Sequence, residues 1–506
     1  MGNGRLNARH YRIAAACVLA AYACATASRF TQGGLALDDA STFLVALRPL
    51  VDIPALAVSF QAQPPLFYLA LHAWLRLGDS EPVLRVLPLI FMLAAAATLL
   101  ATRWLTPLTR VVAVALLLMT PFSAYLTTAL RPYSLSAWLS LWSCLLLVRL
   151  LRRDDPRAAP AALYAIVTVC MAYSVAMTSW TLLAQGICLS IAVAAAAARQ
   201  GVRRALAQHA RLLVSLSLVA ALYLPYVIAV WRLQGALGAP SLTASLGAAL
   251  NPRYFVSGPV YLLTLPGGLG SLALAAAAYA AWCGAVRRDT LVGVLVTIVV
   301  VQISLTHGFL EGRSGFSFRY LAPAYPALCL LAGLGIDRLL SRVRMASAGV
   351  AVCAGCLFIA AAAAFVRAPQ PPVGTWRHVR ADLQRLPGTK LVFFDVGWDA
   401  MRLQYEVRHD SDVRIMSDAG TGWNTGGRSM TPEYVTRAVD QHAGPGRMFF
   451  YEFDPVSDRR VFDAAFAPAM QRHRCVRVYQ RDVPTYSRNG FGEGGALLYG
   501  YACDGV

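Results

Sequence analysis

Residues 290–306, TLVGVLVTIVVVQISLT, form a run without a charged side chain, directly after the charged residues Arg287, Arg288 and Asp289. A helix that crosses the hydrocarbon core of a bilayer needs roughly 17–25 mostly apolar residues, because an α-helix rises about 1.5 Å per residue. Similar runs recur from the N-terminus to about Phe365 and then stop. We therefore expect a polytopic α-helical membrane protein.

The composition of the whole chain agrees with this expectation. Of 506 residues, 57% are hydrophobic and only 14% are charged, which is not the composition of a soluble domain. The net charge of +19 comes almost entirely from arginine, since the one lysine is Lys390. Many of the arginines lie in short loops between apolar runs, where membrane topology concentrates them. We therefore expect the lipid bilayer as a partner, and no nucleic acid.

About eleven transmembrane helices are predicted from the apolar runs. Their expected ranges are 12–29, 82–101, 111–128, 133–150, 160–177, 179–198, 211–230, 268–286, 290–306, 320–337 and 346–366.

Alternate loops differ sharply in arginine content. The arginine-rich set contains Arg5, Arg9 and Arg12; Arg103 and Arg110; Arg149, Arg152, Arg153 and Arg157; Arg199, Arg203, Arg204 and Arg211; Arg287 and Arg288; and Arg338, Arg342 and Arg344. Cytoplasmic loops carry the Lys/Arg excess, so this set is predicted to be inside. The N-terminus is then cytoplasmic, and an odd number of crossings leaves the C-terminal end outside. We expect the first run to remain as a helix, because it lacks a convincing signal-peptide cleavage site.

The chain is predicted to have two domains, residues 1–366 in the membrane and residues 367–506 as a soluble extracytoplasmic α/β domain. The proline-rich linker after Arg367 marks the boundary. Strands are expected at 390–396, 447–453 and 475–479, and helices at 376–386, 400–407 and 432–442. The Gly-rich stretches at 420–423 and 490–495 are expected to be turns.

Cys475 and Cys503 are the only cysteines in the predicted soluble domain. An extracytoplasmic location permits a disulfide between them. A pair of buried free thiols is the alternative.

Two predicted outer segments are longer than a turn, residues 30–81 and 231–267. Within the first, residues 63–77 are apolar and amphipathic but too short to span, so we expect them to lie along the interface. Tyr68, His72, Trp74 and Arg76 suit the headgroup region.

The acidic pair Asp38 and Asp39 follows the first apolar run. Two adjacent carboxylates beside a membrane are costly unless they are solvated, paired or bound to a cation. One could act as a general base, and the pair could coordinate a divalent metal. The alternative is a helix N-cap, although a cap needs only one of them.

Several arginines lie on the predicted outer side, where the positive-inside rule leaves few: Arg85, Arg131, Arg313 and Arg319. A guanidinium binds phosphate oxygens in a bidentate manner, so a lipid-linked phosphate is a natural ligand for the group. Snorkelling to lipid headgroups is the alternative for any single one. No histidine and cysteine spacing indicates a metal site, so metal dependence stays open.

Several stretches, in this order, resemble the GT-C superfamily of polyprenyl-phosphate-sugar-dependent glycosyltransferases. The similar groups are the bacterial relatives of protein O-mannosyltransferases and the lipid A aminoarabinose transferases (glycosyltransferase family 39 and family 83 types). The stretches are LDDA at 37–40, QPPLFYLALH at 63–72, GDSEPVLRVLP at 78–88, RPYSL at 131–135, FRYLAPAYPAL at 318–328 and TWRHV at 375–379.

The resemblance implies roles for individual residues. Asp38 matches the catalytic acid and Asp39 the residue that is usually Glu, so either could be the base. Arg319 and Tyr320 match an Arg-Tyr pair implied to contact the lipid phosphate, and Arg85 and Arg131 match arginines near it. The implied substrate pocket comprises Gln63, Pro64, Pro65, Tyr68, His72 and Tyr133, with Gln63 where relatives often have His.

The function implied is an inverting transfer of a sugar from a polyprenyl-phosphate donor to a glycan, lipid or protein acceptor at the outer face. The location implied is the plasma (inner) membrane of a bacterium. No cofactor is expected with certainty, and a divalent metal remains an option. Two alternatives are a transporter or flippase of a lipid-linked glycan and a non-catalytic scaffold; against the transporter, no internal repeat is evident.

Overall fold

A computed structural model describes residues 8–30, 35–152, 159–235, 251–264, 269–310, 318–343, 375–394, 397–416, 430–453, 461–486 and 493–503. The chain divides into two compact units. The helical unit contains Met1–Phe30 and Leu50–Pro369, and the C-terminal unit contains Thr31–Pro49 and Gln370–Val506. The sequence places residues 31–49 in an outer loop of the membrane domain, whereas the structure groups them with the C-terminal unit.

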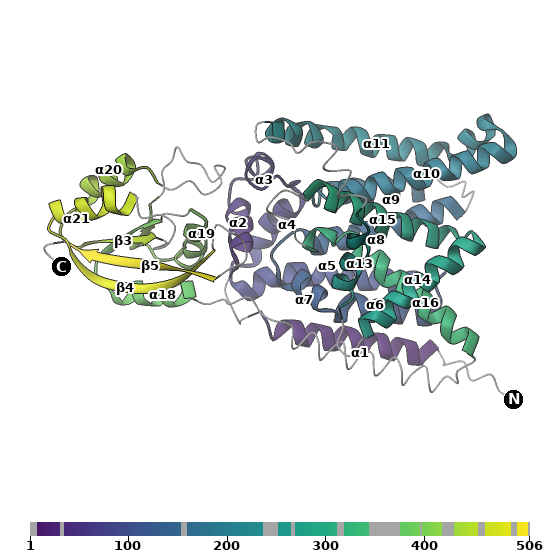
Figure 1. Ribbon diagram of the computed structural model, residues 1–506, viewed down its shortest axis with the longest axis horizontal. Coiled ribbons are helices and arrows are strands. Elements are labelled where there is room, and N and C mark those ends of the chain that lie inside the picture. The colour runs from purple at the N-terminus through teal and green to yellow at the C-terminus, as the bar shows by residue number, and fades with distance from the viewer. Residues whose placement is uncertain are drawn as a thin grey trace. The chain divides into compact units, whose positions relative to one another are not determined.

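The helical unit is built from helices of very different lengths (Figure 1). Its elements are α1 (Ala8–Ala27), α3 (Ile53–Gln61), α4 (Leu66–Trp74), η1 (Leu75–Leu77), α5 (Glu81–Ala101), α6 (Pro107–Met119), α7 (Pro121–Thr128), α8 (Tyr133–Arg152), α9 (Ala159–Ala172), α10 (Thr178–Gln200), α11 (Val202–Gly235), α13 (Pro252–Leu262), α14 (Leu269–Arg287), α15 (Thr290–Leu310), η3 (Phe318–Leu321) and α16 (Tyr325–Val343).

Within the described residues, six helices are long and apolar enough to cross a membrane. They are α5, α8, α10, α11, α14 and α15, and the bent pair of α6 and α7 makes a seventh candidate. The predicted span 346–366 and the linker after Arg367 lie outside the described residues. The count of eleven spans therefore stays a prediction.

The span predicted at 111–128 corresponds to two helices, α6 and α7, which are bent by 65° at their junction. Thr120 adopts an extended backbone there, and its hydroxyl accepts a hydrogen bond from the Ser123 N–H at 3.1 Å, which caps α7. Pro121 follows as the first residue of α7, and a proline cannot continue the hydrogen bonding of the preceding helix.

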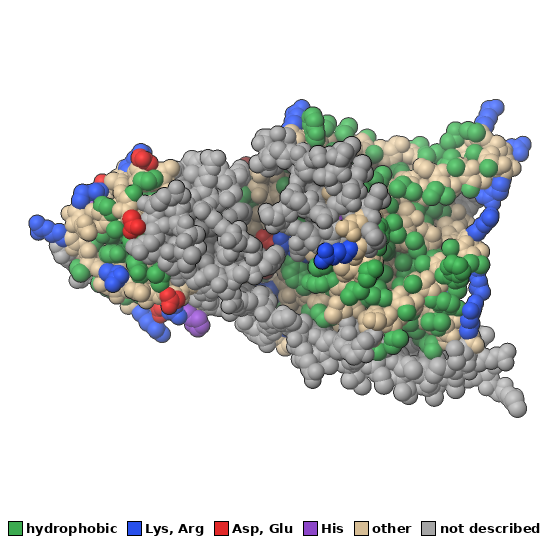
Figure 2. Space-filling view, viewed as in Figure 1, with side chains coloured by type: hydrophobic (Ala, Val, Ile, Leu, Met, Phe, Trp, Pro, Cys, Tyr) green, Lys and Arg blue, Asp and Glu red, His purple; other side chains and the backbone are tan. Residues whose placement is uncertain are grey.

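Large apolar side chains are exposed on the long helices, among them Ile166, Val214, Leu272, Trp282 and Val286. Figure 2 shows hydrophobic side chains gathered over one face of the helical unit. Helices satisfy their own backbone hydrogen bonds, so such a surface is stable against lipid and unfavourable against water. This chain is a membrane protein.

The C-terminal unit combines helices with one mixed sheet (Figure 1). Its elements are α2 (Leu37–Ala46), α18 (Thr375–Arg385), β1 (Thr389–Phe394), α19 (Gly397–Glu406), β2 (Val413–Ile415), α20 (Pro432–His442), β3 (Arg447–Phe453), η5 (Phe462–Phe466), α21 (Ala467–Arg472), β4 (Val476–Tyr486) and β5 (Glu493–Ala502). The strand order is β2-β1-β3-β5-β4. β1 pairs in parallel with β2 and β3, and β5 pairs antiparallel with β3 and β4.

Side chains alternate across this sheet and form a core on each face. Leu391 and Phe393 of β1 pack with Phe449 and Tyr451 of β3 on the face covered by α20, η5 and α21. Val392 and Phe394 pack on the other face, against residues of α18 and α19. The period of two in a strand produces this division from one continuous apolar run.

The predicted strands and helices of this unit match the described elements, and the prediction for α20 agrees to the residue. The turn expected at 490–495 is partly wrong, because Glu493 begins β5. The glycines of β5 allow close packing: a Cβ on Gly500 would lie 2.4 Å from Cε1 of Phe450, its partner in the register. The other Gly-rich stretch, at 420–423, lies outside the described residues.

Candidate functional site

The acidic pair lies in the first turn of α2, in the C-terminal unit. Ala36 occupies the N-cap position with an extended backbone, so the alternative that one of the two aspartates is the N-cap of this helix is wrong. The Asp38 carbonyl accepts hydrogen bonds at 2.8 Å from the hydroxyls of Ser41 and Thr42. Asp38 is partly buried and Asp39 is 4% exposed. The positive end of the helix dipole favours carboxylates at this position.

Two of the predicted phosphate-binding arginines lie in one aromatic cluster of the helical unit. The Arg131 guanidinium carbon is 6.0 Å from the ring centroid of Tyr133, and the Arg319 carbon is 5.3 Å from that of Tyr320. The Tyr133 and Tyr320 rings meet edge to face at 6.1 Å. The sequence resemblance named these four residues, and the structure brings them together from two segments nearly 190 residues apart. We call them the Arg–Tyr cluster.

Both halves of the Arg–Tyr cluster are fixed by hydrogen bonds. Arg131 is 5% exposed, and its Nη1 donates to Oε1 of Gln61 at 2.8 Å. Gln302 of α15 is fully buried, and its Nε2 lies 3.3 Å from the carbonyl oxygen of Tyr320. Gln302 was missed from the sequence, because a single amide inside an apolar run does not indicate its partner. Arg313 lies outside the described residues.

Arg85 is held differently from the other arginines. Its Nε and Nη2 lie 2.8 Å and 2.7 Å from Oε1 of Glu81, one turn earlier in α5. Its Nη1 donates to the carbonyl oxygen of Thr128, the last residue of α7. The Arg85 and Glu81 side chains are 9% and 2% exposed. The pair therefore connects α5 to α7, and a phosphate contact for Arg85 stays a prediction.

The stretch from Gln61 to Leu66 is held from several sides. Oε1 of Gln63 accepts from the Ala176 N–H at 3.1 Å, and the Leu66 N–H donates to the Tyr173 carbonyl at 3.1 Å. Gln63 is 8% exposed, so it anchors the turn between α9 and α10. Pro64 is buried and Pro65 is the N-cap of α4. Their predicted role as pocket residues is untested.

Most of the stretch at 63–77, which was predicted to lie along the interface, forms α4 followed by η1. The assignment of Tyr68 to an exposed headgroup layer is wrong, because Tyr68 is 0% exposed. Tyr68 packs in α4 with Phe67 and Leu71, also buried, while His72 is partly buried. One face of α4, formed by Phe67, Tyr68 and Leu71, is therefore buried inside the helical unit.

No group of three or more His, Cys, Asp or Glu side chains that could hold a metal ion occurs among the residues that the structure describes. Asp38 and Asp39 are two adjacent carboxylates, a ligand type that suits a divalent cation.

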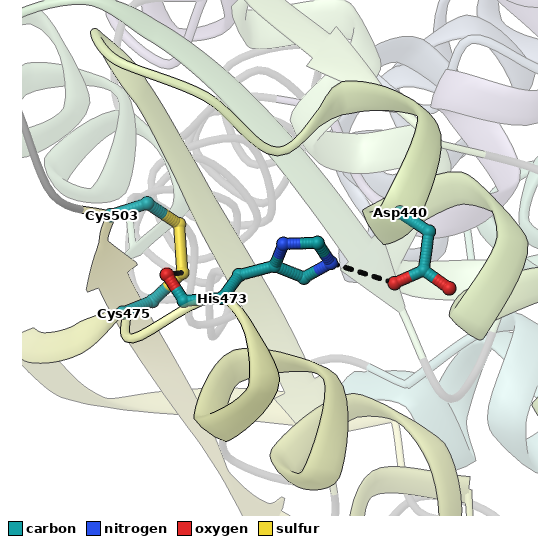
Figure 3. Close-up of a disulfide and its surroundings, with 4 residues drawn as sticks. All are labelled: Asp440, His473, Cys475 and Cys503. Carbon is teal, nitrogen blue, oxygen red and sulfur yellow. Dashed lines mark hydrogen bonds and ion pairs between the residues drawn. A yellow bond between two sulfur atoms is a disulfide. The ribbon is translucent and has the colours of Figure 1, made fainter.

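A disulfide joins Cys475 to Cys503 at the end of the β4–β5 ladder (Figure 3). Nearby, Nε2 of His473 lies 2.7 Å from Oδ1 of Asp440, as Figure 3 also shows. The hydrogen bond from His473 lowers the pKa of the Asp440 carboxyl. The disulfide connects the start of β4 to the end of β5, and the His473–Asp440 contact connects α20 to the residue that follows α21.

Comparison with known proteins identifies the fold. No family model and no curated protein matches this chain. ArnT from Cupriavidus metallidurans in the apo state matches with a TM-score of 0.60 at 13% identity, over 96% of this chain and 97% of that chain. The same protein bound to undecaprenyl phosphate matches with a TM-score of 0.60 at 13% identity, over 98% of each chain.

An archaeal structure also matches. AglB from Archaeoglobus fulgidus, an oligosaccharyltransferase in complex with an inhibitory peptide and a dolichol-phosphate, has a TM-score of 0.51 at 12% identity, over 97% of this chain and 74% of that chain. This chain therefore shares its fold with ArnT and AglB over nearly its whole length, and the resemblance seen in the sequence is confirmed at the level of the fold.

Proposed function

We propose that this protein is an inverting glycosyltransferase that moves a sugar from a polyprenyl-phosphate donor to an acceptor on the outer face of the membrane. The observation that carries the proposal is the Arg–Tyr cluster of Arg131, Tyr133, Arg319 and Tyr320. It lies in a chain with the fold of ArnT, a protein whose structure is known with undecaprenyl phosphate bound.

The Arg–Tyr cluster has the chemistry of a phosphate site. A guanidinium offers a planar fork of donors that matches phosphate oxygens, and its attraction to an anion is stronger where water is excluded. Arg131 is 5% exposed and Arg319 is partly buried. When the bond between the anomeric carbon and the phosphate oxygen breaks, negative charge develops on the leaving polyprenyl phosphate, and these two arginines stabilise it.

The acidic pair supplies the other half of the chemistry. Asp38 takes the proton of the acceptor nucleophile, which attacks the anomeric carbon from the side opposite the phosphate and inverts it. Of the two carboxylates, Asp38 is the less buried and is therefore the better candidate to reach an acceptor. A required divalent cation would be held by Asp38 and Asp39.

The remaining predicted residues shape and hold this site. In this proposal Gln63, Pro64 and Pro65, which precede α4 or begin it, belong to the substrate pocket together with Tyr68, His72 and Tyr133. The arginine-rich loops are cytoplasmic, so the N-terminus is cytoplasmic and the C-terminal unit lies outside the plasma membrane of a bacterium. The acceptor is a glycan, a lipid or a protein.

The test is donor binding and turnover in nanodiscs with a panel of radiolabelled polyprenyl-phosphate sugars and crude membrane acceptors. Asp38→Asn should bind donor with wild-type affinity and lose turnover. Arg319→Ala should weaken donor binding roughly 10- to 100-fold, since a hydrogen bond to a charged group contributes about 1.5–3 kcal/mol.

The matched control is Arg342→Ala, because Arg342 also stacks on a tyrosine, with its guanidinium carbon 5.5 Å from the Tyr279 centroid. It lies in the last turn of α16, on the side predicted to be cytoplasmic, so its loss should leave donor binding unchanged. Wild-type protein that binds donors and consumes none of them would overturn the transferase and favour the transporter or scaffold instead.

A further inference from the structure

The acidic helix α2 packs on helix α19 of the C-terminal unit, more than 350 residues later in the chain. The Phe43 ring of α2 and the Tyr405 ring of α19 meet edge to face, with centroids 5.0 Å apart and planes at 85°. The Arg408 guanidinium carbon lies 4.0 Å from the Tyr405 centroid and 5.8 Å from that of Phe43. Phe43 and Tyr405 are 0% and 3% exposed, so this contact is part of a packed core.

The contact lies directly beside the acidic pair. Residues four apart on an α-helix share a face, so Phe43 and Asp39 point to the same side of α2. A small shift of Phe43 is therefore transmitted over one helical turn to Asp39 and its neighbour Asp38. The hydroxyls of Ser41 and Thr42 bond the Asp38 carbonyl and stiffen that turn.

The helix α2 depends on such packing for its structure. It has only ten residues and no side-chain hydrogen bond at its N-cap. Isolated helices shorter than about 12–15 residues are marginal in water, so tertiary contacts must hold α2 in place.

The partner helix α19 is itself firmly anchored. Leu403 and Val407 are buried in the core against β1 and α18. Just after α19, Asp410 accepts hydrogen bonds from Nε and Nη2 of Arg380 in α18 at 2.7 Å and 2.9 Å. The guanidinium beside it lowers the pKa of the Asp410 carboxyl. A displacement of α19 would therefore disrupt its packing against β1 and α18.

We infer that the C-terminal unit positions the catalytic carboxylate, with Tyr405 and Arg408 of the α19 segment as positioning residues for α2. This inference rests on the proposed function, in which Asp38 is the general base. It assigns the C-terminal unit a direct part in the chemical step of the reaction.

The experiment compares Tyr405→Ala, Tyr405→Phe and Arg408→Ala in full-length protein in nanodiscs. Tyr405→Ala should lower kcat about 10- to 100-fold, because misplacement of a catalytic group by about 1 Å has costs of this size. Donor Kd should change less than about twofold, since the Arg–Tyr cluster is untouched. Tyr405→Phe keeps the ring and should restore kcat to near the wild-type value.

The matched control for Arg408→Ala is Arg477→Ala. Arg477 stacks on a tyrosine of the same unit in the same way, with its guanidinium carbon 4.8 Å from the Tyr499 centroid, but it lies in β4. Its removal should leave kcat unchanged, whereas Arg408→Ala should lower it.

Amide hydrogen exchange of residues 37–46 separates this inference from the proposed function, because it needs no activity. Faster exchange of α2 in Tyr405→Ala supports the docking even if wild-type protein consumes no donor, in which case only the transferase proposal fails. Unchanged exchange together with unchanged kcat would overturn the inference. So would a rise in donor Kd as large as the fall in kcat, because that pattern indicates general damage.

Discussion

Replacing Arg85 alone should destabilise the helical unit at least as much as replacing Glu81 and Arg85 together. The two side chains are 2% and 9% exposed, and Nη2 of Arg85 lies 2.7 Å from Oε1 of Glu81. In Glu81→Gln the guanidinium keeps its charge inside the protein without the carboxylate that offsets it. In Arg85→Met the Glu81 carboxylate likewise keeps its charge inside the protein without the guanidinium that offsets it.

The expected magnitude follows from the burial of this pair. Removing one partner of a buried ion pair costs about 3–5 kcal/mol, mainly because the other charge stays buried without compensation. Arg85→Met also removes the hydrogen bond to the Thr128 carbonyl, at about 1 kcal/mol. The double variant buries no uncompensated charge and should cost no more than Arg85→Met alone. The two changes are then non-additive by at least the cost of the Glu81 change alone, about 3–5 kcal/mol.

The assay is denaturant unfolding in mixed micelles of wild type, Glu81→Gln, Arg85→Met and the double variant. Donor binding is measured on the same four proteins. Arg76→Met is the control: Arg76 is an exposed arginine in η1, and its loss should change stability by less than about 0.5 kcal/mol. Additive effects of the two single changes would refute the reasoning. Wild-type stability with lost donor binding in Arg85→Met would show instead that Arg85 is a phosphate ligand, as the sequence resemblance implies.

Two further predictions concern the C-terminal unit. Loss of the Cys475–Cys503 disulfide, whose cysteines are 28 residues apart, should lower the free energy of unfolding of this unit by about 3–4 kcal/mol. Denaturant unfolding of a Cys475→Ser/Cys503→Ser variant measures this change, and the control Cys283→Ser should leave the unfolding transition of this unit unchanged. Maleimide labelling of Cys475 and Cys503 in untreated protein would contradict the presence of the disulfide. The Arg380–Asp410 pair lowers the pKa of Asp410 below its ordinary 3.8, so the folded state binds this proton less readily than the unfolded state. The stabilisation that the Arg380–Asp410 pair gives the folded state should therefore be complete above about pH 5 and be lost as the pH falls through the lowered pKa of Asp410. The free energy of unfolding, measured against pH, should show this loss in wild type and not in Asp410→Asn. Parallel curves for the two proteins would contradict the prediction.

The features that the sequence predicted well are those with a local cause. Apolar runs such as 290–306 predict helices directly, because the hydrophobicity and the length of a segment are both local properties of the sequence. Helix α20 was placed to the residue because Thr431 caps it and Pro432 occupies its first position, where a proline is well tolerated. The bend at Thr120 had the same signals, but they lay inside an apolar run that was long enough to be one span.

The features that the sequence could not predict depend on contacts between distant segments. Strand β5 contains Gly494, Gly495 and Gly500, which weaken a strand signal, and it forms because β3 and β4 lie on either side of it. The hydrogen bond from Gln302 to the Tyr320 carbonyl and the ring contact between Tyr133 and Tyr320 have no local pattern at all. The resemblance to GT-C transferases supplied the cluster residues without their arrangement.

The most consequential of these contacts is the one between Phe43 and Tyr405. By hydropathy alone, residues 30–49 are an outer loop anchored by the first helix, and the soluble domain is a separate body after residue 366. The acidic helix is too short to be stable without a partner, and its described aromatic partner lies in α19. A cut in the chain before Thr375 would therefore remove the packing that orders Asp38 and Asp39, even though both precede the cut by more than 330 residues. If Asp38 is the general base, as we propose, the C-terminal unit is part of the catalytic apparatus rather than an appended domain.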